Sequence, residues 1–152
     1  MRLALLRCVV DVSVGIKLYI AESLSERADA LFLQLATDPA AELVVPDLFY
    51  VECANILWKN VRRTGLPASQ ARRAVAELAK LGLRRVSTLE LIPGALAIAL
   101  SHSITAYDAC YVALTSRLDI PFVTADERLA RQLAETSYDV RWLNDFPLPP
   151  TP

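Results

Sequence analysis

The segment Cys8–Val14 constrains the fold most, because an apolar, β-branched run leads directly into a carboxylate. Its first three residues are typical of a parallel strand that is buried on both faces, and Asp11 follows them at once. A charge at the end of a buried strand is costly unless it is paired or bound to a metal ion. Ligands of open α/β sheets lie at the carboxyl ends of strands, so Asp11 is a candidate site residue. The alternative is a structural turn, with Ser13 as the N-cap of the next helix.

The length of 152 residues and an apolar fraction of 54 % indicate one well-packed domain. We expect a folded domain over 1–145 and a proline-rich tail over 146–152 that does not pack as an element. The cysteines lack metal-type spacing and lie in apolar stretches, so we expect small, reduced core residues at Cys8, Cys53 and Cys110. The net charge of −1 does not by itself indicate nucleic-acid binding.

The first ten residues are apolar, but their pattern is not that of a signal peptide. Arg7 interrupts the run, Asp11 ends it, and no small-residue cleavage site follows. No apolar stretch reaches the length of a membrane span. We therefore expect a soluble, cytoplasmic protein without a membrane contact.

Strand and helix patterns alternate along the chain. After the first strand we predict strands over 42–45, 83–86, 120–124 and 139–143. We predict a helix from Ser23 or Ser25 to about residue 36 and a helix over 89–100 that is capped by Thr88. We predict further helices over 13–20, 46–63, 69–82, 105–117 and 126–135. This alternation predicts an α/β fold with a parallel sheet covered on both faces.

The predicted helix over 46–63 is apolar around most of its circumference at about 100° per residue, which is typical of a buried helix. Its polar residues gather on one narrow stripe, as on the wall of a cleft: Glu52, Asn55, Lys59, Arg62 and Arg63. The alternative for Glu52 is an internal ion pair with Lys59 or Arg63.

Two more acids lie near predicted helix starts. Asp108 lies three residues after Thr105, a capping-box spacing that could explain it without any chemistry. Thr124 and Glu127 fit a second capping box, which would leave Asp126 free to point elsewhere. A structural role for Asp126 at the positive end of a helix is the alternative.

Asp47 and His102 carry less weight as site residues. Asp47 follows a predicted strand, but the pair Pro46-Asp47 is typical of an ordinary helix start. His102 lies outside the polar stripes and is expected to be structural.

The four acids Asp11, Glu52, Asp108 and Asp126 follow strands or open helices, positions that share one edge of a parallel sheet. Two carboxylates about 4 Å apart repel by about 4 kcal/mol at an effective dielectric of about 20. A cluster of them must therefore take up protons or bind cations. Oxygen-only ligation suits Mg²⁺ or Mn²⁺, ions that activate water and stabilise the leaving oxygen of a phosphodiester.

Residues 62–85 hold a local excess of positive charge, with Glu77 as their single acid. Such an excess favours contact with a phosphate backbone, although a solvated basic face is the alternative. The basic residues are Arg62, Arg63, Arg72, Arg73, Lys80, Arg84 and Arg85.

Four motifs in this order resemble the PIN-domain nucleases, and within them the VapC-type toxins of bacterial and archaeal toxin–antitoxin pairs. The motifs are Val10–Val14 with Lys17, Glu52 in a long helix after Val45–Pro46, Thr105–Tyr111, and Phe122–Leu129. The resemblance covers nearly the whole chain. It implies a three-layer α/β/α PIN-like fold with a short central parallel sheet, and it assigns no role to the proline-rich tail.

The same resemblance implies RNA cleavage with Mg²⁺ or Mn²⁺, a homodimer, and inhibition by a cognate antitoxin whose C-terminal segment fills the groove. It implies that the catalytic metal ligands are Asp11, Glu52, Asp108 and Asp126. Supporting hydroxyls would come from Ser13 and Thr124, and candidate substrate or site contacts would be Lys17, Asn55 and Lys59.

Our leading hypothesis is thus a metal-dependent endoribonuclease that acts as a toxin. A phosphotransfer enzyme of the haloacid-dehalogenase type also has an aspartate after its first strand, but it needs a second one where Ser13 stands. The non-enzymatic alternative is a PIN-like scaffold that binds RNA or a protein without cutting. The presence of all four acids argues against that alternative.

Overall fold

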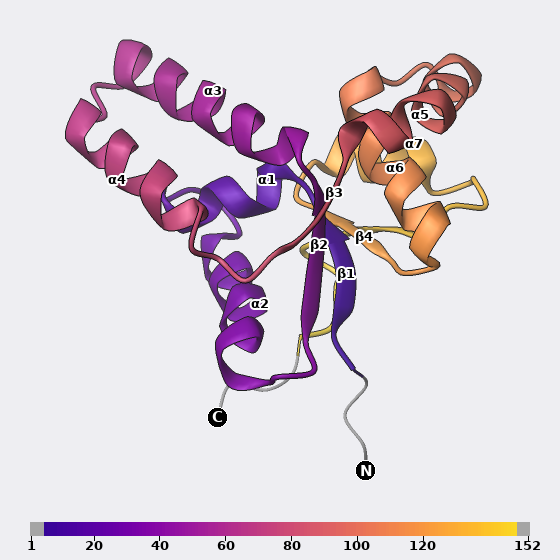
Figure 1. The fold of residues 1–152 in the computed structure, drawn as a ribbon, viewed down its shortest axis with the longest axis horizontal. Helices are drawn as coiled ribbons and strands as arrows, with labels where there is room; N and C mark the ends of the chain where they lie inside the picture. The colour runs from indigo at the N-terminus through magenta and orange to yellow at the C-terminus, as the bar shows by residue number, and fades with distance from the viewer. Residues whose placement is uncertain (1–4, 149–152) are drawn as a thin grey trace.

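The computed structural model describes residues 5–148 and contains a five-stranded parallel sheet in the order β3–β2–β1–β4–β5 (Figure 1). The strands are β1 (Arg7–Val10), β2 (Glu42–Pro46), β3 (Arg84–Val86), β4 (Phe122–Thr124) and β5 (Val140–Trp142). Residues 1–4 of the predicted domain and 149–152 of the predicted tail lie outside the described part.

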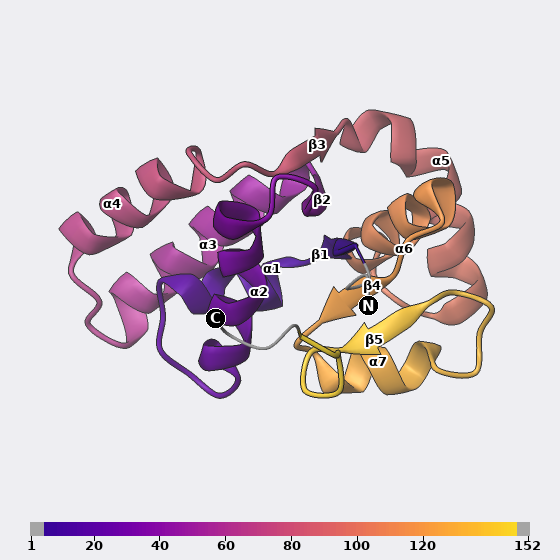
Figure 2. The ribbon, with the colours of Figure 1, turned by 90° about the horizontal axis from the view of Figure 1, so that it is seen from below.

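Helices cover both faces of this sheet (Figures 1 and 2). One side holds α1 (Val12–Gly15), the 3₁₀ turn η1 (Ile16–Leu18), α2 (Ser25–Thr37), α3 (Leu48–Arg63) and α4 (Ala68–Leu78). The other side holds α5 (Thr88–His102), α6 (Ala106–Leu118) and α7 (Glu127–Leu133). The predicted three-layer α/β/α fold is confirmed.

The core follows from the composition of the three central strands. The apolar residues of β1, β2 and β4 are fully buried, as expected for strands that are covered on both faces. The edge strands β3 and β5 are three residues long and carry exposed arginines, which disfavours pairing with another sheet. The predicted core cysteines, Cys8, Cys53 and Cys110, are buried free thiols.

The sheet has a topological switch point between β1 and β4. From β1 the chain crosses to β2 and then β3, and it returns to β4 on the other side of β1. Crevices at such points, outside the carboxyl ends of the strands, are the usual ligand sites of open α/β sheets. Asp11 directly follows β1 and Asp126 lies two residues after β4, so both acids lie at this crevice.

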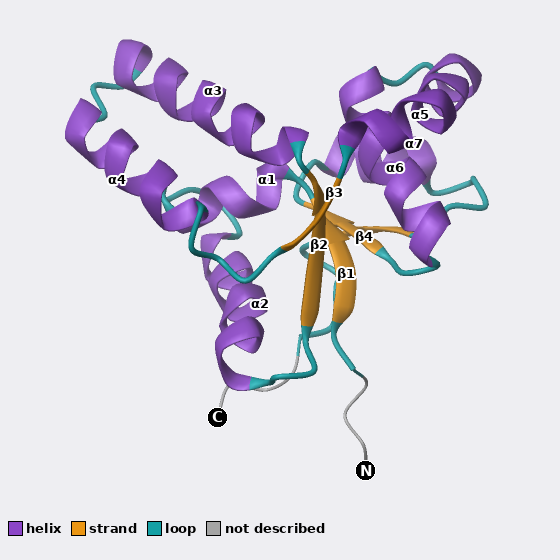
Figure 3. Cartoon of the chain, viewed as in Figure 1, coloured by secondary structure: helices purple, strands orange, loops and turns teal. Residues whose placement is uncertain are grey.

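The prediction that α3 is buried nearly all round was wrong. Phe49, Cys53 and Leu57 are buried, but Val51 and Trp58 are 67 % and 55 % exposed. The physical reason is that α3 and α4 form a hairpin that runs away from the strands, so only one face of α3 meets the body (Figure 3).

Several predicted helix starts were also wrong in detail. Asp11, not Ser13, is the N-cap of α1, and the predicted helix over 13–20 is a short α1 followed by η1. Thr88 lies inside α5, where its backbone N–H and its hydroxyl donate to Asp47 Oδ1. Asp47 therefore joins the start of α3 to the start of α5 rather than facing the other acids.

Gly15 allows the chain after β1 to pack closely against α3. A Cβ at this position would lie 2.6 Å from Phe49 Cζ, and Phe49 is fully buried. A larger residue would displace a core ring, so the absence of a side chain fixes how near α1 lies to α3.

The described part of the predicted tail is attached to the body. Phe146 is 5 % exposed and belongs to the main core. Arg27 donates to the backbone carbonyls of Leu143 (2.9 Å) and Phe146 (2.5 Å). The folded body therefore includes Phe146, one residue past the predicted boundary.

Within residues 5–148, no single helix has both the length and the apolar character to cross a membrane. Helices α5 and α6, which are bent by 113° relative to each other, meet that test only when taken as a pair.

Candidate active site

Asp11 is a buried carboxylate that is held by hydroxyl groups. Its side chain is 4 % exposed, and Ser13 and Thr124 donate hydrogen bonds to Oδ1 (2.5 Å) and Oδ2 (2.7 Å). No lysine, arginine or histidine of the described residues forms an ion pair with it. Asp11 is therefore fixed in orientation but lacks a counter-charge.

The two hydroxyls also join the ends of β1 and β4. Ser13 Oγ lies 3.2 Å from Thr124 Oγ1 and accepts a hydrogen bond from the backbone N–H of Ala125 (2.9 Å). Thr124 Oγ1 accepts one from the N–H of Asp126 (3.1 Å). Both hydroxyls thus hold Asp11 and the loop that carries Asp126.

Asp126 itself caps α7. Its Oδ1 accepts a hydrogen bond from the N–H of Leu129 (3.0 Å), so the predicted capping box of Thr124 with Glu127 was wrong. The hydroxyl of Thr124 is engaged by Asp11 and by the Asp126 N–H and does not reach the helix. The second carboxylate oxygen of Asp126 has no hydrogen bond among the described residues, and the residue is exposed.

Glu52 is positioned by a buried tyrosine. The hydroxyl of Tyr111 donates to Glu52 Oε1 over 2.6 Å, and the Tyr111 ring stacks on Phe122 at 5.6 Å between centroids. Burial and the Glu52 charge raise the pKa of Tyr111, so it stays a proton donor. Sequence reasoning did not assign Tyr111 to the site, although it lies one helical turn after Asp108 on the same side of α6.

Asp108 lies in the first turn of α6, and the predicted cap is present. Thr105 Oγ1 accepts a hydrogen bond from the N–H of Asp108 (3.1 Å). The reciprocal bond of a full capping box, to the Asp108 carboxylate, is absent from the described residues. Capping therefore accounts for Thr105, whose side chain also lowers the pKa of Asp108 through a hydrogen bond, although burial raises that pKa overall.

The four acids are electrostatically coupled through Asp108. Burial raises the pKa of Asp11 to about 7, and burial also raises the pKa values of Glu52 and Asp108. The charge of Asp108 further raises the pKa of both Asp11 and Glu52, and the charge of Asp126 raises the pKa of Asp108. Asp108 therefore lies near enough to Asp11, Glu52 and Asp126 for the charges in these three pairs to act on one another.

The donor set fits a hard divalent cation by its chemistry. It consists of carboxylate oxygens, the ligands that Mg²⁺ and Mn²⁺ prefer, and cations relieve the burial and repulsion that raise these pKa values. As the side chains stand, no three His, Cys, Asp or Glu residues within 5–148 lie close enough together to hold one ion. Binding of one ion by three of these residues would thus require their side chains to move closer together. The carboxylate oxygen of Asp126 that has no hydrogen bond among the described residues is available as a ligand.

The remaining predicted contacts do not join this network. Lys17, which lies within η1, is buried and forms an ion pair with Glu22 over 2.8 Å. Its ammonium group forms no ion pair with Asp11. Asn55 and Lys59 are exposed on α3, and neither forms a side-chain hydrogen bond or ion pair among the described residues. His102 packs edge-on against Tyr138 at 5.7 Å, which agrees with a structural role.

Comparison with known proteins gives one family. A family model described as PIN domain matches residues 8–134. Ribonuclease VapC3 of Pyrobaculum aerophilum is 37% identical over 129 residues, which are 84% of this chain and 95% of that protein.

Two solved structures share the fold at low sequence identity. The crystal structure of PAE2754 from Pyrobaculum aerophilum aligns with a TM-score of 0.64 and 20% identity, over 91% of this chain and 85% of that one. A toxin–antitoxin complex from Klebsiella pneumoniae aligns with a TM-score of 0.60 and 13% identity, over 89% and 96%.

Replacement of Asp11 by asparagine should stabilise the metal-free protein at alkaline pH. The folded-state pKa of Asp11, about 7, lies above its ordinary value of 3.8, so its protonated form contributes stability at low pH that is lost as pH rises through 7. In EDTA we expect the Tm of Asp11→Asn to exceed that of the wild type by several degrees at pH 8, with a much smaller gap at pH 4 to 5.

Asp119→Asn is the matched control, because Asp119 is exposed in a left-handed conformation that asparagine tolerates. Its Tm should follow that of the wild type across the same pH range. An Asp11→Asn protein that is less stable than the wild type at pH 8 in EDTA would contradict the description of Asp11 as an uncompensated buried charge.

Proposed function

The chain belongs to the PIN-domain family of nucleases, and from this premise we propose that it is a metal-dependent endoribonuclease of the VapC toxin type. The observation that carries the proposal is a chain of neighbouring carboxylates, in which the charge of Asp108 raises the pKa values of Asp11 and Glu52 and the charge of Asp126 raises that of Asp108. The 37% identity to a ribonuclease, over most of both chains, supports RNA as the substrate.

Asp11, Glu52, Asp108 and Asp126 would hold the Mg²⁺ or Mn²⁺ ions. A bound ion of this kind supplies an activated water and neutralises charge that develops on a phosphodiester. Ser13 and Thr124 keep Asp11 in one orientation, and Tyr111 does the same for Glu52. The burial of Asp11 and Tyr111 keeps bulk water from this end of the site.

The basic hairpin of α3 and α4 supports contact with a polyanion. Arg63, Arg72 and Arg73 are exposed and have no ion pair within residues 5–148, whereas Arg84 is paired with Glu42 and Arg62 lies over the Trp58 ring. We propose that the unpaired guanidinium groups contact the RNA backbone beyond the site, in a salt-dependent manner.

An apolar stripe on α5 supports a homodimer. Leu89, Ile92, Leu96 and Leu100 are 78%, 48%, 54% and 76% exposed, and their spacing places them on one side of the helix. Exposed apolar stripes of this kind mark interaction surfaces, and a two-fold axis would place the same stripe of a second copy against it. We propose this surface as the dimer interface.

The hollow between α3 and α4 supports an antitoxin contact. It has a volume of about 390 Å³ and an apolar wall that includes Trp58, Val61 and Val75, with Arg72 at its edge. A segment with apolar and acidic side chains would suit these walls, and one fold neighbour is a toxin–antitoxin complex. We propose that a cognate antitoxin binds here, and that the protein acts in the cytoplasm.

RNA cleavage with purified protein tests the proposed function. We expect an RNA oligonucleotide to be cut internally with Mn²⁺ or Mg²⁺ and to stay intact in EDTA. Asp11→Asn and Asp126→Asn should each lower the rate by roughly a hundredfold or more, because each removes a metal ligand. Asp119→Asn should cleave at the wild-type rate.

Cleavage in EDTA, or full activity of Asp11→Asn with metal present, would contradict the assignment of the site. RNA binding without cleavage by the wild type would instead favour the scaffold alternative. Suppression of cleavage by the product of a neighbouring small gene would support the toxin assignment, and its failure would count against the toxin role but not against the nuclease.

The dimer is tested by sedimentation velocity at micromolar concentration. The wild type should sediment as a dimer, and Leu96→Glu should sediment as a folded monomer because a buried charge in the interface would be unpaired. Val51→Glu, an exposed apolar residue on α3, serves as the control and should stay dimeric. A monomeric wild type, or a dimeric Leu96→Glu, would contradict the interface.

A further inference from the structure

A small hollow adjoins two of the four acids. Its volume is about 140 Å³, and its walls include Asp108, Asp126 and Arg128. It lies between the first turn of α7 and the turn from α5 to α6, so it is separate from the hollow of the α3–α4 hairpin. The other lining residues are Ser103, Ile104, Thr105, Leu129 and Gln132.

The walls of this hollow are held in place by hydrogen bonds. Gln132 Nε2 donates to the carbonyls of His102 (3.0 Å) and Ser103 (3.4 Å), which ties α7 to the turn after α5. Thr105 Oγ1 accepts from the N–H of Asp108, and its side chain also hydrogen-bonds the Asp108 carboxylate, which lowers the pKa of that group. These hydrogen bonds hold the turn from α5 to α6 against α7 and fix the position of the first turn of α6.

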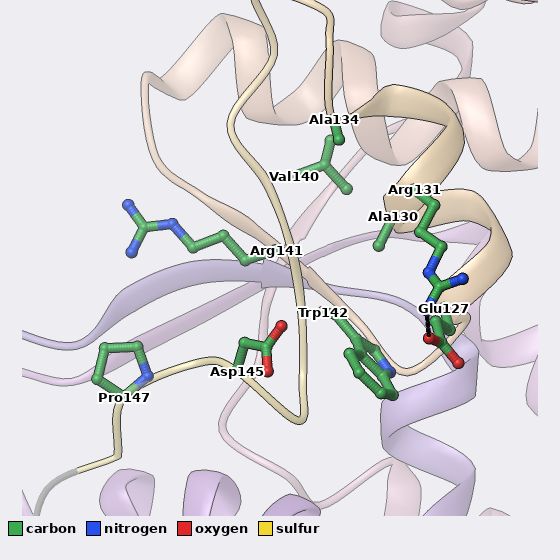
Figure 4. Close-up of a pocket in the computed structure, with 9 residues that line it drawn as sticks. All are labelled: Glu127, Ala130, Arg131, Ala134, Val140, Arg141, Trp142, Asp145 and Pro147. Atoms are coloured by element: carbon green, nitrogen blue, oxygen red, sulfur yellow. Dashed lines mark ion pairs between the residues drawn. The ribbon is translucent and has the colours of Figure 1, made fainter.

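Arg128 is the cation of the hollow. It is exposed, and within residues 5–148 it has no ion pair, although two carboxylates line the same space. The next arginine of α7, Arg131, pairs with Glu127 and lines a different hollow of about 410 Å³ (Figure 4). The guanidinium group of Arg128 thus remains available for an anion, which it can bind through two parallel hydrogen bonds.

We propose that Arg128 forms a subsite for the RNA phosphate next to the one that is cleaved. This inference rests on the proposed function. An RNA strand whose scissile phosphate lies at the four acids places a neighbouring phosphate one nucleotide away, within the field of the same carboxylates. The guanidinium group offsets that repulsion and fixes the register of the strand. Arg128 is a substrate-positioning residue in this account.

RNA binding tests the subsite without requiring cleavage. In an Asp11→Asn background, fluorescence anisotropy with a labelled oligonucleotide should show that Arg128→Ala raises Kd about tenfold, the lower end for a charge-assisted contact because the residue is exposed. The slope of log Kd against log salt should fall by about 0.7, as expected for the loss of one phosphate contact on a single strand. Arg128→Lys should restore part of the affinity, since it keeps the charge but not the two-bond geometry.

Arg131→Ala is the matched control, because it removes an arginine from the same helix on a wall of the other hollow (Figure 4). It should leave Kd and the salt slope within twofold of the parent. Equal losses in Arg128→Ala and Arg131→Ala would overturn the subsite, because they would indicate general electrostatic attraction.

A substrate with one neutral linkage identifies the phosphate. In the active background, Arg128→Ala should raise KM about tenfold with little change in kcat. With a methylphosphonate at the contacted neighbouring position, the wild type should lose the same factor and Arg128→Ala should lose almost nothing more. A penalty that persists for every single methylphosphonate position would overturn the proposal. A wild type that cleaves no RNA would overturn the proposed function, while the anisotropy comparison would still decide the phosphate contact.

Discussion

The carboxylate of Asp11 is buried at the end of the central strand and receives two hydroxyl hydrogen bonds instead of a cation. Burial of a charge without a counter-ion opposes folding, and here it is compounded by Asp108, which faces both Asp11 and Glu52. A chain retains such an arrangement at a cost to its stability. Such a departure from the usual rules of burial is typical of functional sites.

The order of the strands and the packing of the helices bring these acids toward one edge of the sheet. The order of strands places β1 beside β4, so that two strand ends with acids meet at the switch point. The close approach of α1 to Phe49, which Gly15 permits, brings the start of α3 beside the same edge. Tyr111, which stacks on Phe122 in the core, orients Glu52 through a hydrogen bond. The contacts of Gly15 with Phe49 and of Tyr111 with Phe122 therefore both pack the core and position residues of the candidate site.

Sequence patterns predicted the sheet and its layers, since these follow from apolar runs and from the geometry of parallel strands. The same patterns placed the four acids toward one edge of the sheet, but within residues 5–148 no three of them lie close enough together to hold one ion. The patterns did not predict that Trp58 is exposed. Helical periodicity does not distinguish a face that packs against the core from one that lies along a helix hairpin projecting from it, as α3 and α4 do. The helix caps predicted at Ser13 and Thr124 were wrong for a related reason. Both hydroxyls had local helical partners in sequence, but tertiary contact with Asp11 competed successfully for them.

The coupling of the four acids is tested most directly by calorimetric titration of the metal-free protein with Mn²⁺, in two buffers that differ in ionisation enthalpy. Because the pKa of Asp11 is about 7, metal binding at pH 6.5 should release protons, with a smaller release at pH 8.5. Asp11→Asn should bind the ion more weakly and release fewer protons. Equal affinity in the two proteins, or binding without proton release at pH 6.5, would contradict the account of one acidic site that is completed by a cation.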